Sequence, residues 1–169
     1  NGSYSNVTIL TACYTCTQDG VVTIGTAINA DANGNNARLF KIQAASDINV
    51  NNAISLANSL NNNYYNTHAL ELNSTNGDIN LLATVRTQPY STNNAVGTAY
   101  YSGSITLSAV NGTIGSTSAG VINASGYNAT NTGYSQYAGS INISARNINI
   151  ASAITATSNK GNASFGGNI

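Results

Sequence analysis

Pairs of apolar residues, each separated by one intervening residue, recur along this chain at intervals of about 30 to 36 residues. Because side chains alternate between the two faces of a strand, such a pair sends both apolar side chains to one face and the residue between them to water. An interval of this size is typical of solenoids, in which each repeat forms one coil. The pairs that open the units are Val7/Ile9, Phe40/Ile42, Leu70/Leu72, Ile105/Leu107 and Ile141/Ile143.

Each unit continues with the same order of segments: a polar break, a second alternation, a third alternation and a long polar excursion. The second alternations are Val22/Ile24, Ile48/Val50, Ile79/Leu81, Ile114 alone, and Ile148/Ile150. The third are Ile28/Ala30, Ile54/Leu56, Ala83/Val85, residues 121–124 and Ile154/Ala156. The excursions span residues 31–38, 58–68, 87–103, 125–139 and 157–168. This order predicts three short strands and one loop per coil.

The fold that this pattern predicts is all-β, a right-handed parallel β-helix (β-solenoid) of about five three-stranded coils. Strands of a sandwich would pair through tight hairpins, whereas equivalent strands here return only after a whole unit. No segment carries a sustained 3.6-residue period, so long helices are not expected. The right hand follows from the general rule for parallel crossover connections. We expect one domain over residues 1–169, with residues 1–39 as the first coil and residues 40–169 as four further coils.

The charge composition excludes several classes of partner. Only 6% of the 169 residues are charged and the formal net charge is zero, so there is no electrostatic case for nucleic acid or an anionic membrane. No apolar run approaches the roughly 20 residues of a membrane-spanning helix, and membrane insertion is not expected. Hydrophobic residues make up 41% of the chain, which argues against wholesale disorder.

Two phrases of the sequence carry a family resemblance: "GSITLSAVNGTI" from Gly103 and "GSINISARNINI" from Gly139. They resemble the β-helical repeats of filamentous-haemagglutinin-type exoproteins, the large secreted adhesins of two-partner secretion systems. The resemblance covers residues 40 to 169, while the Asn-Pro-Asn-type motif of the family's secretion domain is absent and the chain is far shorter than those adhesins. It implies a β-helical fold and an extracellular or cell-surface location.

Both ends of the pattern look like open coils. The alternation at Val7, Ile9 and Leu10 already resembles a coil strand, and Ile169 sits where a next first strand would begin. Exposed strand edges invite pairing with another molecule, and a head-to-tail contact that does not close yields a filament. We therefore expect these residues to be assembly ends that join copies of the chain into a homopolymer. The alternative is that the chain is a fragment of a longer solenoid.

Cys13 and Cys16 form the chain's one Cys-x-x-Cys. No βαβ pattern supports a redox site, and His68 is the only other good zinc ligand, so we expect a structural cystine in an oxidising extracellular setting. A local bridge requires a turn between the two cysteines, and otherwise the bridge is intermolecular. No metal or other cofactor is expected.

An enzyme is the last of the functional hypotheses. β-helix hydrolases act through two facing carboxylates, but the acids of this chain are spread over its units. A catalytic triad around His68 would need a positioned nucleophile and acid that the sequence does not reveal. The acids are Asp19, Asp31, Asp47, Glu71 and Asp78. We expect no catalytic residues.

Most tyrosines fall in the excursions, which would stack along one side of the solenoid. Amphipathic rings gathered on one face suit an interface or a platform for carbohydrate, although they would equally suit a cover over a sheet. The candidate contact residues are Tyr64, Tyr65, Tyr90, Tyr100, Tyr101, Tyr127, Tyr134 and Tyr137.

Asn-x-Ser/Thr sequences are about as frequent as chance predicts for a chain so rich in these residues. The candidate N-glycosylation sites are Asn6, Asn73, Asn111, Asn123, Asn128, Asn142 and Asn162.

Three non-enzymatic functions follow from these features. The first is a secreted structural subunit that stacks end to end into an extracellular filament, sheath or surface fibre. The second is a segment of a β-helical adhesin that binds surface glycans or neighbouring cells through the tyrosine-rich face. The third is a pilin-like sandwich completed by a neighbour's donated strand, which "NVTILTA" from Asn6 would supply.

Overall fold

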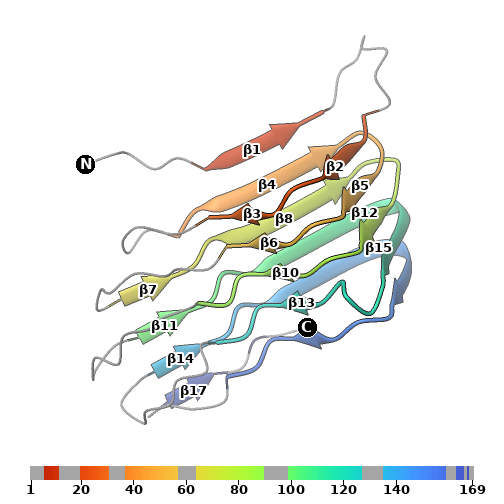
Figure 1. The fold of residues 1–169 in the computed structure, drawn as a ribbon. Helices are drawn as coiled ribbons and strands as arrows, with labels where there is room; N and C mark the ends of the chain where they lie inside the picture. Colours follow the sequence, from red (N-terminus) through yellow and green to blue (C-terminus); the bar gives the residue numbers. More distant parts are fainter. Residues whose placement is uncertain are drawn as a thin grey trace.

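The computed structural model describes residues 6–11, 20–30, 37–56, 64–89, 99–126, 135–158, 163–165 and 167. Within them every regular element is a β-strand, and every strand pairing is parallel. The strands stack as coils (Figure 1). The chain is therefore an all-β solenoid, as the sequence predicts. The described residues form no helix long and apolar enough to cross a membrane.

The largest sheet has eight strands and two limbs. In the first limb, the opening apolar pairs lie in one register, for example Val7 beside Phe40, Phe40 beside Leu70 and Leu70 beside Ile105. Its strands are β1 (Val7–Leu10), β4 (Leu39–Ala44), β8 (Ala69–Ser74), β12 (Ile105–Ser116) and β15 (Ile141–Ile150). The second limb consists of the later halves of β12 and β15 together with β2 (Val22–Ile24), β5 (Ile48–Val50) and β9 (Ile79–Leu81).

The third alternations form a five-stranded sheet of two-residue strands. One predicted pair is wrong: Val85, not Ala83, stands in the column of Ile54 and Ile122. The second inward place of that coil therefore falls to Thr87, which is fully buried although polar. The strands are β3 (Ile28–Asn29), β6 (Ile54–Ser55), β10 (Val85–Arg86), β13 (Ile122–Asn123) and β16 (Ile154–Thr155).

The prediction of three strands per coil was incomplete, because the excursions contribute strands of their own. These form a four-stranded sheet. Its strands are β7 (Tyr64–Asn66), β11 (Ala99–Tyr101), β14 (Ser135–Tyr137) and β17 (Ala163–Phe165). They lack the aliphatic alternation that marks the other strands, so the sequence pattern does not reveal them. They pair because the coils beneath them hold successive excursions in register.

Buried polar groups join the excursions to the five-stranded sheet. Where one excursion leaves the core, the Thr87 hydroxyl donates to the carbonyl oxygen of Gly103 at 2.5 Å. In the next coil, the Gly139 N–H donates to the carbonyl oxygen of Ala124 at 2.8 Å. Such bonds satisfy backbone groups that the turn into the excursion would otherwise bury without a partner.

The core is built from aliphatic columns that run through successive coils. The apolar face of each coil is covered by the neighbouring coils, so burial of an aliphatic side chain depends on the coils above and below it. The largest fully buried side chains are Ile42, Ile48, Ile54, Leu56, Leu70, Leu72, Ile79, Leu81, Ile105 and Leu107.

Stacked coils approach so closely at one corner that only glycine fits. A Cβ atom added to Gly139 would lie 2.1 Å from the carbonyl oxygen of Gly103, whereas real Cβ atoms stay beyond about 3 Å of such neighbours. Gly25 is the contrasting case, since an added Cβ there would meet nothing within 4 Å.

We expect Gly139→Ala to lower the free energy of unfolding by about 1–3 kcal/mol, because the two coils must separate to admit the methyl group. Gly25→Ala is the matched control and should change that free energy by less than about 0.5 kcal/mol. Urea denaturation followed by circular dichroism measures both. Equal effects of the two variants would show that close coil stacking does not require glycine at position 139.

Candidate assembly interface

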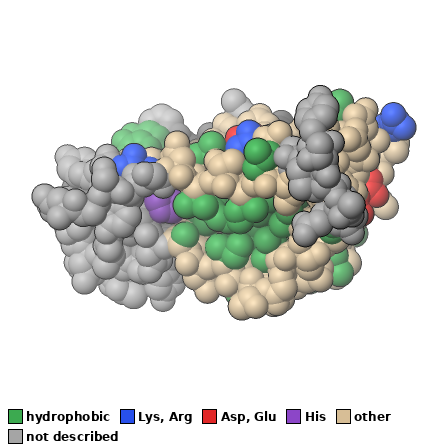
Figure 2. Space-filling view, turned by 90° about the horizontal axis from the view of Figure 1, so that it is seen from above, with side chains coloured by type: hydrophobic (Ala, Val, Ile, Leu, Met, Phe, Trp, Pro, Cys, Tyr) green, Lys and Arg blue, Asp and Glu red, His purple; other side chains and the backbone are tan. Residues whose placement is uncertain are grey.

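The β1 end of the solenoid exposes the residues that the sequence marks as an assembly end. Val7, Ile9 and Leu10 are 50%, 38% and 58% exposed. Ile9 stands in the same column as Ile42 and Leu72, both of which are fully buried. Figure 2 looks down on this end and shows hydrophobic side chains gathered in the middle of the face.

The β15 end repeats this arrangement. Ile148 is 55% exposed, whereas Ile114 and Ile79, its neighbours in the same column, are fully buried. Further aliphatic side chains of this end are only partly buried, namely Ile143, Ile150 and Ile154. Ile169, the other predicted assembly residue, lies outside the described residues. Among the described residues, no further coil covers the exposed side chains of either end.

The backbone groups at the two edges are complementary. The Ile105 N–H donates to the carbonyl oxygen of Ser140, in the following coil, at 2.9 Å. Ile141 is the next residue in this column, so its N–H points to the open edge beyond β15. The Ala69 N–H donates to the carbonyl oxygen of Arg38, in the preceding coil, at 2.8 Å. By the same alternation, the Thr8 N–H of β1 points away from β4, to the other open edge. Each edge therefore presents the donors and acceptors that a parallel strand needs.

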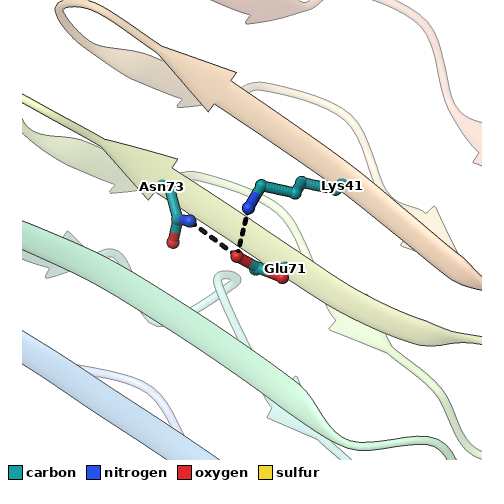
Figure 3. Close-up of polar contacts among 3 residues, drawn as sticks. All are labelled: Lys41, Glu71 and Asn73. Carbon is teal, nitrogen blue, oxygen red and sulfur yellow. Dashed lines mark hydrogen bonds and ion pairs between the residues drawn. The ribbon is translucent and has the colours of Figure 1, made fainter. Parts of the chain in front are cut away.

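The described residues contain one ion pair, on the outward face of the first limb. Lys41 Nζ lies 2.7 Å from Glu71 Oε1, and Asn73 Nδ2 donates to the same oxygen at 2.6 Å (Figure 3). The hydrogen bond from Lys41 lowers the pKa of Glu71 below its ordinary value, against a smaller opposing effect of burial, and Asn73 lowers this pKa further. Lys41 and Glu71 occupy the same place in consecutive coils, so the aligned repeats contain the signal for this contact.

The described aspartates accept backbone hydrogen bonds at the corner between the two limbs. Asp47 Oδ1 accepts the Asp78 N–H at 2.8 Å, and Asp78 Oδ1 accepts the Thr113 N–H at 2.7 Å. Each carboxylate thus satisfies a backbone donor of the next coil. The two remaining acids, Asp19 and Asp31, lie outside the described residues.

His68 and the cysteines complete the titratable side chains singled out above. His68 Nδ1 accepts the backbone N–H of Arg38 at 3.0 Å, which joins two adjacent coils. In the part of the chain that the structure describes, no three His, Cys, Asp or Glu side chains gather as a metal site would require. Cys13 and Cys16 lie outside that part, so their pairing stays a prediction.

Among the predicted contact tyrosines, the structure describes the side chains of two, Tyr101 and Tyr137. The rings of Tyr101 and Tyr137 stack with centroids 4.4 Å apart and planes 9° from parallel, and Tyr101 is 39% exposed. Tyr64, Tyr65 and Tyr100 belong to strands of the four-stranded sheet. The side chains of these three and the whole of Tyr90, Tyr127 and Tyr134 lie outside the described residues.

The candidate glycosylation sites differ in their surroundings. Asn6, Asn111 and Asn142 are exposed. Asn73 and Asn123 are partly buried, and their Nδ2 groups donate to Glu71 and Gln88, which leaves them less accessible to a modifying enzyme. Asn128 and Asn162 lie outside the described residues.

Comparison of the chain with protein-family models, with curated proteins and with solved structures finds no match.

We expect Lys41→Met to raise the pKa of Glu71, because the main cause of its lowering is removed. A carboxyl whose pKa is lowered on folding stabilises the protein above its unfolded pKa and ceases to do so as pH falls through the folded value. The free-energy difference between wild type and variant, roughly 0.2–1 kcal/mol at neutral pH, should therefore shrink below about pH 4.5. Glu71 is the chain's only glutamate, so glutamate-selective ¹³C labelling gives one carboxyl resonance to titrate.

Arg146→Met is the matched control, since it removes one positive charge from an exposed position of β15. It should leave the titration of Glu71 unchanged. A shift as large as that caused by Lys41→Met would assign the effect to net charge and not to the ion pair.

Proposed function

We propose that this chain is a non-enzymatic structural subunit of an extracellular filament, sheath or surface fibre, which assembles by end-to-end pairing of β-strands. Its partners in this proposal are copies of itself. The observation that carries it is the exposure of apolar columns at both ends, by Val7 and Ile9 of the first limb on one side and by Ile148 of the second limb on the other.

Stacking β1 of one copy on β15 of another would continue the columns of the core. In that arrangement Val7 follows Ile141, and Ile9 follows Ile143, as equivalent residues follow one another within the chain. Burial of the exposed aliphatic side chains would contribute about 25 cal/mol per Å² of apolar surface, and the open N–H and C=O groups of the two edges would gain partners. Such a contact is heterologous, and copies stacked along one axis through it continue as an open filament.

The finer geometry and the location belong to the same proposal. We take the solenoid to be right-handed, by the rule for parallel crossovers, with about five coils of the three main strands. The extracellular location follows from the resemblance of the repeat phrases to those of secreted β-helical adhesins. A pilin-like sandwich has less support, since β1 pairs in parallel with β4 of its own chain.

The test of assembly is negative-stain electron microscopy of the purified chain and of Thr8→Pro. Proline removes the N–H that points to the open edge, and edge strands tolerate it at such places. We expect unbranched filaments from the wild type and a loss of most filament length in the variant. Thr8→Val, which keeps the N–H, is the matched control and should assemble like the wild type.

Circular dichroism before imaging establishes that each variant is folded. Discrete short particles from the wild type would overturn the proposal and favour a segment of a longer solenoid. Equal filaments from wild type and Thr8→Pro would rule out pairing through the open edge of β1.

A second function, binding of surface glycans, is favoured by the Tyr101–Tyr137 stack. Two parallel rings, one of them substantially exposed, offer the flat apolar surface on which sugar rings pack. We expect Tyr101→Ser with Tyr137→Ser to abolish retention on a glycan array, and Tyr101→Phe with Tyr137→Phe to preserve it. Retention that survives the serine pair would exclude the stack as the binding surface.

A further inference from the structure

One column of outward side chains breaks its own pattern. On the second limb of the large sheet, the column runs Thr23, Asn49, Asn80, Gly115 and Asn149 in register. Asn80 Nδ2 donates to Asn49 Oδ1 at 2.9 Å, which forms one step of an amide ladder. Gly115 has no side chain to continue this ladder, so one rung is missing between Asn80 and Asn149.

The corner that follows Gly115 is also unusual. Three residues separate the second-limb strand from the next strand at four of these corners, as between Val50 and Ile54. Between the end of β12 at Ser116 and the start of β13 at Ile122 there are five. The extra residues form a turn in which the Gly120 N–H donates to the carbonyl oxygen of Thr117 at 3.0 Å.

A third departure lies in the same segment. Ser116 occupies the column in which other coils place Val50, Leu81 and Ile150. Three breaks in the repeat thus fall within residues 115–121. In repeat proteins the scaffold is maintained by the consensus, and positions that depart from it at one place are candidates for a site grafted onto the fold.

The departures surround a hollow of about 220 Å³ whose lining includes Asn80, Leu82, Gly115, Thr117 and Asn149. A Cβ atom added to Gly115 would meet only the Asn149 carbonyl oxygen at 3.9 Å and Asn80 Oδ1 at 4.0 Å. Leu82 is 47% exposed and supplies an apolar wall. The hollow is smaller than the roughly 300–1,000 Å³ of pockets for drug-sized ligands, so it suits a group of a few atoms or a single sugar ring.

The polar groups beside the hollow are those that recognise an amide. Asn80 uses its Nδ2 on Asn49, so its Oδ1 is the atom left to accept a hydrogen bond on the side of Gly115. Asn149 is exposed, and its side chain makes no hydrogen bond within the described part of the chain. Since neighbouring strands lie about 4.8 Å apart, an amide at the missing rung would have an acceptor on one side and a donor on the other.

We propose that this hollow binds the acetamido group of an N-acetylated amino sugar. The amide N–H donates to Asn80 Oδ1, the amide oxygen accepts from Asn149 Nδ2, and the methyl group packs against Leu82. The sugar thus supplies the amide that Gly115 lacks. This site lies on a different face from the tyrosine stack and does not depend on assembly of the chain.

Saturation-transfer difference NMR with N-acetyl-D-glucosamine tests the proposal, because it observes the small ligand whether the protein is monomeric or assembled. We expect the strongest saturation at the acetyl methyl protons, and none for D-glucosamine, which lacks the acetyl group. Gly115→Asn fills the missing rung with the repeat's own residue, and it should reduce the signal at least tenfold. Gly25→Asn introduces the same side chain at another open glycine and should leave the signal unchanged.

Four outcomes would overturn the proposal. Absence of saturation transfer with the wild type would exclude acetamido binding, and equal transfer to D-glucosamine would exclude recognition of the amide. A full signal in Gly115→Asn would place the binding elsewhere. If Gly115→Asn reduces self-association while the sugar shows no signal, the occupant is an amide side chain of a second copy and the sugar proposal is wrong.

Discussion

Parallel, in-register stacking of identical strand positions is the constraint on which the other features of this structure depend. A single coil has too little apolar surface to form a core alone, so each aliphatic side chain is buried by the equivalent side chains above and below it. Leu70 and Ile105 are almost completely buried in this way, while Val7, at the end of their column, is half exposed. The same contact that makes the core therefore leaves both ends apolar.

Register also decides what the polar residues do. A polar side chain that lies beside its equivalent in the next coil must hydrogen-bond to that side chain or to the backbone of that coil. Where neither is possible, the position takes glycine, which has no side chain. Asn80 pairs with Asn49, Asp78 accepts a backbone N–H of the next coil, and Gly139 leaves room for the carbonyl group of Gly103. A low charge content suits this architecture, since like charges would otherwise face each other at strand spacing. Lys41 above Glu71 is the arrangement of opposite charges that stacking permits.

Two kinds of surface follow from this architecture, and they suit different roles. The ends repeat the pattern of the core and offer edges to another coil, which is the basis for the proposed assembly. The sides are set by outward columns that are free to vary, and there the stacked tyrosines and the hollow at Gly115 give local character to an otherwise repetitive surface. The proposed binding on the sides is compatible with the proposed assembly through the ends because the two use different faces of the coil.

Much of the fold was determined by the sequence itself. The two-residue spacing of aliphatic pairs and their return after each unit predicted the parallel strands and, for the first two alternations, the register that the structure shows. The third alternation is shorter, so Ala83 was wrongly assigned to the column of Ile54 and Ile122, in which Val85 stands. The strands in the excursions were not predicted because their sequences carry no aliphatic alternation. Backbone hydrogen bonds between successive excursions hold them in the sheet.

Contacts between coils required the tertiary structure. The sequence shows that Lys41 and Glu71 hold equivalent positions, yet only the stacking brings their charged atoms to 2.7 Å. The hollow is the clearest case, since neither a glycine nor a five-residue corner predicts a cavity alone. It arises because residues far apart in the sequence, Asn80, Gly115 and Asn149, become neighbours across strands. The sequence by itself determines which side chains of a strand share a face. The shape of the gap between neighbouring coils is determined only by how successive units pack.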